Sequence, residues 1–270
     1  SNPPYVPTDY NPTGVYARDF TLPTAWQGRR TIIKFGAVGS AIYLYINGHE
    51  VGYSQDSKTP AEWDITRYLQ PGRNRVATKV IRWCDGSYLE CQDMWRMSGI
   101  TRDVELYSVP QTYITDIKVI ADIDTNDWHT GLLDVMVDLN HEVTGGTVTI
   151  ALHSIDGFSV DGLGHGIRLA KGDWFAIHQS RHAGIQPWTD TTPTLYNLVV
   201  TLCDAQGRET ERITKRIGFR HVDISNGQLR LNGQPMEIRG VNRHEHSMYG
   251  GHYVTPDEMR QDIAMMKEMG

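Results

Sequence analysis

The feature that most constrains the fold is an alternating run that leads into a polar loop and then into a helix. The run MEIRGVNRHEH (residues 236–246) begins with the alternation typical of a strand and ends in polar side chains. A strand, polar groups at its C-terminal end and an outer helix form the repeating unit of a β/α-barrel. One such unit cannot close a barrel, so we expect the chain to be the front part of a larger protein.

The helix after this loop is well signalled at both ends. Thr255 is suited to the N-cap, Pro256 to the first helical position, and Glu258 completes a capping box. Apolar residues then recur at helical spacing from Met259 onward, and Gly270 stands where a C-cap belongs. These signals predict a helix from about residue 256 to the end.

Length and charge narrow the class of protein. A chain of 270 residues suggests two domains and part of a third. A net charge of −6 gives no electrostatic footprint for nucleic acid or an anionic membrane, and no long apolar run predicts a membrane span. We therefore expect neither nucleic acid nor membrane as a partner.

The cysteines favour a reducing compartment. Cys84, Cys91 and Cys203 are scattered and odd in number, which argues against a disulfide framework or a four-ligand zinc site. Cys84 and Cys91 are able in principle to pair, but bridge geometry is demanding and free thiols are expected.

Strands dominate the chain before the barrel-like unit. In residues 1–110 the strand-length runs are 31–38, 41–46, 50–53, 75–83 and 103–109, with Asn47-Gly48 as a hairpin turn. Their long connecting loops predict a sandwich or jelly roll. In residues 111–219 we expect about seven strands, including 114–120, 131–139, 147–153, 195–203 and 212–218, as in an immunoglobulin-like sandwich. Two short strands turning at Asn226-Gly227 and Asn232-Gly233 then lead into the barrel start in residues 220–270.

The densest chemistry lies in the loop DGSYLECQDMWRMSG (residues 85–99). Its carboxylates and amide suit hard cations and sugar hydroxyls, while Tyr88 and Trp95 offer flat faces for sugar rings. The alternative is a solvated loop whose aromatic side chains fill the core and whose Arg96 pairs internally. Composition alone leaves both readings open.

The run His244-Glu245-His246 suggests a metal, but it is not the H-E-x-x-H pattern and no third ligand is evident nearby. Histidines that hydrogen-bond a substrate at a barrel mouth fit better. The early NPTG (residues 11–14) reads locally as a turn. The chain has no G-x-S-x-G elbow, Walker loop or Rossmann glycine pattern.

Taken together, these motifs resemble glycoside hydrolase family 2, in particular its lacZ-type β-galactosidases. The motifs that occur in the family's order are NPTG (11–14), GYSQDS (52–57), the 85–99 loop, GFR (218–220) and RGVNRHEH (239–246). The resemblance implies a mainly β, multidomain fold: a jelly-roll sugar-binding domain (1–110), an immunoglobulin-like β-sandwich (111–219) and the first βα unit of a (β/α)8 TIM barrel (220–270).

The resemblance also implies the activity. The family's enzymes retain configuration and use two carboxyl groups about 5 Å apart, as acid/base and as nucleophile. In the family both are glutamates on later barrel strands, and neither Glu90 nor Glu245 lies in a matching motif. We therefore expect hydrolysis of terminal β-D-galactosides such as lactose by the full-length protein, and none by this chain alone.

The site residues that the resemblance implies form a binding shell. Asn11, Asp93 and His244 match substrate-binding positions, with Asp93 also a sodium ligand and His244 a possible transition-state stabiliser. Gln55 and Asp85 resemble members of an outlying magnesium site. Without a ligand, Asp93 would simply accept backbone hydrogen bonds, and His244 would be a satisfied polar group.

Other readings stay open. A related family 2 specificity, β-glucuronidase or β-mannosidase, is one rival, and a non-catalytic carbohydrate-binding module is another. The family resemblance further implies a homo-oligomer and Na+ and Mg2+ in the full-length enzyme. A cytoplasmic location is expected, with a periplasmic one as the alternative.

Overall fold

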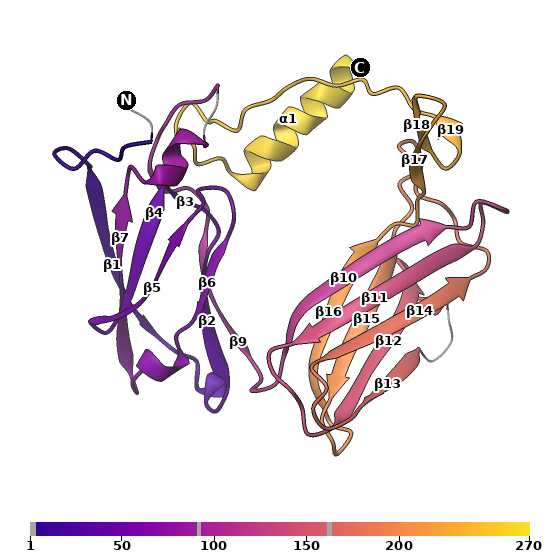
Figure 1. Cartoon of the computed structure of the whole chain (residues 1–270), viewed down its shortest axis with the longest axis horizontal. Helices are drawn as coiled ribbons and strands as arrows, with labels where there is room; N and C mark the ends of the chain where they lie inside the picture. Colours follow the sequence, from indigo (N-terminus) through magenta and orange to yellow (C-terminus); the bar gives the residue numbers. More distant parts are fainter. Residues whose placement is uncertain (1–3, 91–92, 161–163) are drawn as a thin grey trace. The chain divides into compact units, whose positions relative to one another are not determined.

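The computed structural model describes residues 4–90, 93–160 and 164–270. It divides into two compact units, Ser1–Val109 with Val241–Gly270, and Pro110–Gly240. Strands are the main regular structure of both units (Figure 1), which confirms the mainly β, multidomain fold class. The domain boundaries drawn from the sequence, 1–110, 111–219 and 220–270, stay a prediction.

The first unit is a β-sandwich whose strands all pair antiparallel. One sheet has the order β1 (Thr13–Thr21), β7 (Arg73–Ile81), β4 (Ala41–Ile46) and β5 (His49–Gln55). The other has the order β6 (Ala61–Asp64), β2 (Arg30–Phe35) and β9 (Val104–Val109). A short pair, β3 (Val38–Gly39) and β8 (Gly99–Ile100), lies beside them, with 3-10 turns η1 (Thr24–Trp26), η2 (Thr66–Tyr68) and η3 (Asp85–Tyr88).

The core of this unit follows from strand alternation. In β4 the side chains of Ile42, Leu44 and Ile46 are at most 1% exposed, whereas the tyrosines between them are only half-buried. Residues from both sheets join these three in one apolar cluster. The turn after β4 places Asn47 at φ 50° and Gly48 at φ 84°, the left-handed pair that a two-residue hairpin needs. The predicted hairpin is confirmed.

The second unit is a seven-stranded sandwich. One sheet has the order β10 (Ile114–Ile123), β11 (Gly131–Leu139) and β14 (Phe175–His182). The other has the order β13 (His165–Leu169), β12 (Gly146–Ser154), β15 (Tyr196–Cys203) and β16 (Glu209–Ile217). Side chains from both sheets share one core. The sequence left β13 and β14 unplaced because β14 inverts the usual pattern: Phe175 and Ile177 are exposed, while His182 is buried.

A small antiparallel meander completes the second unit. It consists of β17 (Val222–Ser225), β18 (Gln228–Leu231) and β19 (Gln234–Pro235). Both turns are Asn-Gly pairs with positive φ at each residue, as expected from the sequence.

The final helix, α1 (Pro256–Met269), is confirmed with its caps. The backbone N–H of Glu258 donates to Thr255 Oγ1 at 3.2 Å, and the Glu258 carboxylate accepts from Thr255 N at 2.8 Å. Gly270 follows at φ 80°. Within the described residues, no helix is long and apolar enough to cross a membrane.

The strand predicted at the start of the run 236–246, ahead of its polar loop, is wrong. Regular structure ends with β19 at Pro235, and the following residues are irregular up to the start of α1, apart from an isolated bridge. A barrel strand is held by hydrogen bonds to neighbours on both sides. Among the described residues no strand pairs with this run, and Ile238 and Val241 are more than 70% exposed. Alternation in the sequence cannot form a strand without a partner.

Candidate functional site

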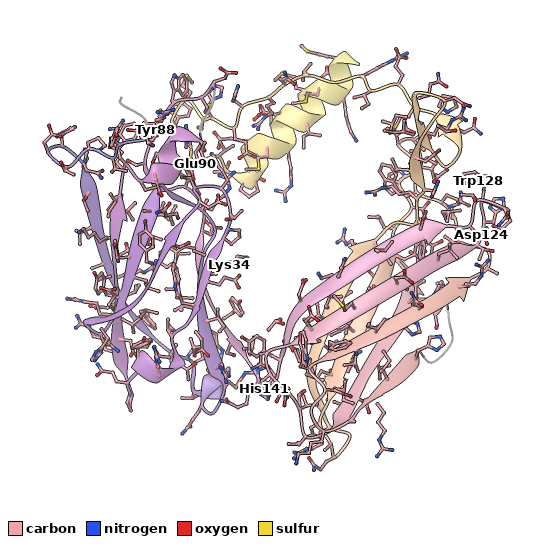
Figure 2. All side chains as sticks on the ribbon, viewed as in Figure 1. Lys34, Tyr88, Glu90, Asp124, Trp128 and His141 are labelled. Carbon is pink, nitrogen blue, oxygen red and sulfur yellow. The ribbon has the colours of Figure 1, made fainter. Side chains whose placement is uncertain are left out.

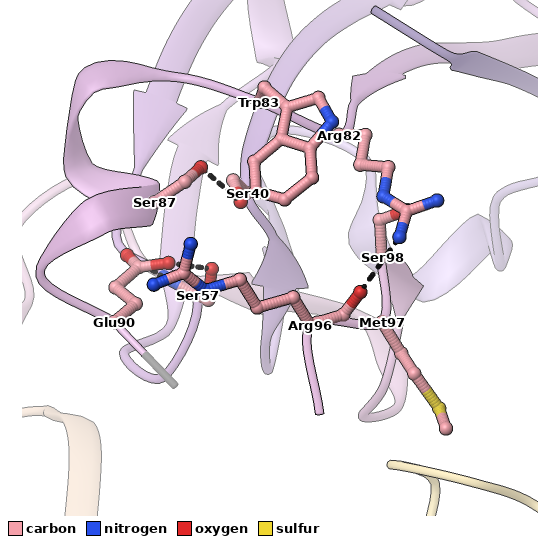
Figure 3. Close-up of a pocket in the computed structure, with 9 residues that line it drawn as sticks. All are labelled: Ser40, Ser57, Arg82, Trp83, Ser87, Glu90, Arg96, Met97 and Ser98. Atoms are coloured by element: carbon pink, nitrogen blue, oxygen red, sulfur yellow. Dashed lines mark hydrogen bonds between the residues drawn. The ribbon is translucent and has the colours of Figure 1, made fainter. Parts of the chain in front are cut away.

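Hydrogen bonds of Ser87 and Glu90 hold the loop of residues 85–99 to the first sandwich (Figure 3). The Glu90 carboxylate accepts hydrogen bonds from the backbone N–H of Ser57 at 3.0 Å and from the Ser57 hydroxyl. Ser87 Oγ donates to Ser40 Oγ at 2.8 Å and accepts from Cys84 N at 3.0 Å. These contacts join the described first part of the loop to Ser57, just after β5, and to Ser40, just before β4.

Cation–π contacts order the same loop. The Arg96 guanidinium lies 5.9 Å from the Trp83 ring and 5.8 Å from the Tyr88 ring. Arg82 covers Trp83 at 5.3 Å and donates to the Arg96 carbonyl at 3.1 Å. Tyr88 and Glu90 lie close together at one end of the first unit (Figure 2). Arg96 therefore pairs internally, as the alternative reading of this loop expected.

Trp95 remains accessible to a ligand, because the residue is 58% exposed. Its ring meets the edge of the His246 ring, with the centroids 5.4 Å apart and the planes at 85°. Arg102 and Glu245 form an ion pair beside it. The 85–99 loop and the histidine-rich run, far apart in sequence, thus lie against each other within one unit.

His252 is buried beneath this contact, with only 6% of its side chain exposed. Burial lowers its pKa, and the positive charge of Lys58 acts in the same direction, while a hydrogen bond to the backbone of Trp95 opposes the shift. The ring is therefore neutral near pH 7. Among the described residues, its Nε2 atom has no hydrogen-bond partner.

The predicted substrate-binding residues have different surroundings. Asn11 uses both amide atoms on one backbone position, donating to Trp83 O at 2.8 Å and accepting from Trp83 N at 3.0 Å. Asp93 is exposed, in a left-handed conformation at φ 53°. The side chain of His244 is also exposed. In the described part of the chain, no hydrogen bond joins any two of these three residues.

The two predicted magnesium residues lie in one neighbourhood. Gln55 Nε2 donates to Tyr53 Oη at 2.6 Å, and its Oε1 lies 3.5 Å from where a Cβ on Gly86 would stand. Asp85 accepts from the adjoining Gly86 N–H at 3.0 Å. Partial burial raises the pKa of Tyr53, and the negative charge of Asp85 adds to the shift. Gln55 and Asp85 are therefore near each other through Gly86.

Acidic, histidine and cysteine side chains gather in no group of three or more suited to a metal, in the residues that the structure describes. Cys84 and Cys203 are free thiols. Cys91, considered as a partner for Cys84, lies outside the described residues.

Sequence reasoning missed Arg102 and the Glu90–Ser57 contact. Arg102 sits in an ordinary turn between β8 and β9, and nothing in its neighbours marks it. Its importance comes from a partner more than a hundred residues away in the chain. The sequence indicates Trp95 as a flat face for a sugar ring, but it does not indicate that His246 lies against this ring.

Three family models together match nearly the whole chain. They are "Glycosyl hydrolases family 2, sugar binding domain" at residues 1–110, "Glycosyl hydrolases family 2" at 112–220 and "Glycosyl hydrolases family 2, TIM barrel domain" at 222–270. The chain belongs to glycosyl hydrolase family 2.

Its curated relatives include β-galactosidases. The chain is 43% identical over 274 residues to that of Psychromonas ingrahamii and 44% identical over 276 residues to that of Pectobacterium atrosepticum. Each alignment covers 99% of this chain but 26% of the relative, so the chain spans about a quarter of their length. Among solved structures, a Bacteroides uniformis β-glucuronidase matches with a TM-score of 0.86 and 25% identity, covering 97% of this chain and 33% of that one.

Proposed function

We propose that the chain is the N-terminal part of a retaining β-galactosidase that hydrolyses terminal β-D-galactosides such as lactose. The observation that carries this is the identity of 43–44% to β-galactosidases over 99% of the chain. The solved β-glucuronidase has a similar fold, but its identity is only 25%. Fold alone does not set the substrate of a glycosidase, because specificity depends on the side chains of the site.

In this proposal the chain contributes binding groups. The exposed carboxylate of Asp93 is free to accept sugar hydroxyls, and the exposed ring of His244 can donate or accept one hydrogen bond. Asn11 acts differently, since its amide is occupied by the Trp83 backbone. We assign it to holding the start of the 85–99 loop, with any sugar contact made as a third hydrogen bond.

The catalytic acid and nucleophile are proposed to lie outside this chain. The Glu90 carboxylate is hydrogen-bonded to Ser57, and the Glu245 carboxylate is paired with Arg102, so each already has a partner. A retaining glycosidase needs two carboxyl groups about 5 Å apart on either side of the scissile bond. These two glutamates instead bind separate partners of the first unit.

Metals are proposed at two places. Asp93 supplies one carboxylate toward Na+, and the remaining ligands must come from elsewhere. Gln55 and Asp85 fit Mg2+ better, because Gln55 Oε1 lies near Gly86, the neighbour of Asp85, and Mg2+ commonly keeps several waters beside one or two carboxylates. Bound Mg2+ would hold the 85–99 loop against β5. Titrating Mg2+ into the chain should release binding heat in a calorimeter, and no heat, or the same heat from Asp85→Asn, contradicts this site.

Activity tests the main proposal directly. The 270-residue chain should not turn over a chromogenic β-galactoside, whereas the protein extended through a complete barrel should. Activity of the chain alone would refute the assignment of the catalytic pair. In the extended protein, Asp93→Asn should lower kcat/KM for the galactoside by roughly tenfold or more, since a charged hydrogen bond contributes about 1.5–3 kcal/mol.

The β-glucuronidase fold match motivates one comparison. The extended protein should be assayed on matched nitrophenyl galactoside and glucuronide substrates. Preference for the glucuronide would replace the proposed substrate within the same family. Binding of glycans without hydrolysis of either would favour the carbohydrate-binding alternative.

A further inference from the structure

We propose that Arg102 and Trp95 are positioning residues that hold the loop of residues 242–252 so that the exposed His244 side chain keeps one place on the surface. The inference rests on the proposed function, in which His244 binds substrate. Neither Arg102 nor Trp95 needs to touch the sugar. Their role is to restrict the loop before substrate arrives, which lowers the ordering cost of binding.

The residues on both sides of His244 are held by side-chain contacts. Its neighbours on the C-terminal side are both held, Glu245 by the Arg102 guanidinium and His246 by the Trp95 ring. Its neighbour on the other side, Arg243, is held as well, through Nε to the Asp262 carboxylate of α1 at 2.7 Å. A residue between three anchored neighbours has little backbone freedom left.

Arg102 is itself a fixed point. Its Cβ packs on the backbone of Gly36, where an added Cβ would lie 2.7 Å away. Gly36 N in turn donates to the carbonyl of Asp103 at 3.0 Å, beside the β2–β9 ladder. Arg102 Nη1 donates to the carbonyl of Thr101 at 3.1 Å. The guanidinium therefore projects from the sandwich framework, and its side chain is only one-third exposed.

The far end of the loop is closed by a second set of contacts. Ser247 and Gly251 exchange backbone hydrogen bonds at 2.8 and 3.0 Å. Ser247 Oγ donates to Glu258 at 2.7 Å, which links the loop to the capping box of α1. Met97 packs on Gly251 so closely that a Cβ there would lie 2.9 Å from its sulfur. The 85–99 loop thus contacts this segment at two points, through Trp95 and Met97.

A simple packing role would depend on volume and not on charge, and this difference defines the test. Amide hydrogen exchange is measured across residues 242–252 of the 270-residue chain for Arg102→Glu, Glu245→Arg and the double variant. A partly exposed ion pair contributes up to about 1 kcal/mol, so each single variant should speed exchange there about fivefold. The double variant should restore it. Arg18→Glu, an exposed change outside the loop, is the matched control.

Trp95 and Gly251 test the remaining contacts. Trp95→Ala should speed exchange in the loop, and Trp95→Phe should largely rescue it because an aromatic edge contact is retained. Gly251→Ala should act likewise through the Met97 clash. Gly72→Ala is its control, since both glycines have positive φ but an added Cβ at Gly72 meets nothing within 4 Å.

Unchanged exchange in the single variants, or failure of the charge swap to restore it, overturns the proposal. In the extended protein, the singles should raise KM for a β-galactoside several-fold and the double variant should recover it. Loop release without any change in KM or kcat also overturns the positioning role. If the wild-type extended protein hydrolyses no galactoside, the proposed function fails, while the exchange result still decides whether Arg102 and Trp95 fix the loop.

Discussion

Asn11→Ala should destabilise the first unit through the backbone of Trp83. The change removes the hydrogen bond from Asn11 Nδ2 to Trp83 O, 2.8 Å, and the one from Trp83 N to Asn11 Oδ1, 3.0 Å. Each such bond contributes about 0.5–1.5 kcal/mol net, so the expected loss is about 1–3 kcal/mol. A loss of 2 kcal/mol corresponds to a fall in Tm of roughly 4–8 °C for a domain of about 150–250 residues.

Asn11→Asp separates the two bonds. The carboxylate still accepts from Trp83 N, but it places a second oxygen against Trp83 O in place of the donor. Destabilisation should therefore equal or exceed that of alanine at pH 7. It should shrink as the pH falls below about 4, where the side chain protonates and donates again.

Urea unfolding followed by tryptophan fluorescence measures both variants, with Asn242→Ala as an exposed control in the same unit. If Asn11→Ala lies within about 0.5 kcal/mol of wild type, the backbone clamp contributes little, and the residue should be reconsidered as a direct substrate ligand.

Further outcomes follow from other contacts. Hydrogen bonds from Arg75 and Arg73 lower the pKa of Asp19 from 3.8 to about 2. The ionised Asp19 therefore stabilises the fold fully above pH 3.8, and this contribution is lost as the pH falls through about 2. An NMR titration should show this midpoint, and it should rise in Arg75→Ala. Leu198→Ala, at a fully buried position, should cost about 2–5 kcal/mol in urea unfolding, whereas a similar cost for the exposed Leu89→Ala would contradict the assigned core. Thr255→Ala should reduce α1 helicity by circular dichroism and cost about 0.5–2 kcal/mol, and unchanged helicity would rule out the cap.

Local chemistry made much of the fold predictable. The strand from Ala41 to Ile46, its Asn47-Gly48 turn and the capping box at Thr255 were all readable, because each depends on residues within a few positions. β14 was missed because it exposes apolar side chains and buries His182, and such an inversion is decided by what packs on each face.

The candidate site was only partly predictable. The 85–99 loop and the run around His244 stood out by composition, and the internal pairing of Arg96 was foreseen as one of two readings. The ion pair between Arg102 and Glu245 was not foreseen, because neither residue belongs to a local pattern. Likewise, nothing in the motif of residues 11–14 indicates that the Asn11 amide hydrogen-bonds the backbone of Trp83.

The sequence by itself determined the β-rich architecture and the capped final helix, since periodicity, turn residues and caps act over short distances. Only the tertiary structure decided which polar groups are free. Burial and pairing are properties of segments brought together from distant parts of the chain, and they leave Asp93 and His244 exposed while occupying Asn11, Glu90 and Glu245. The same physics explains why residues 236–246 alternate like a strand and yet form none: a strand requires a partner as well as a pattern.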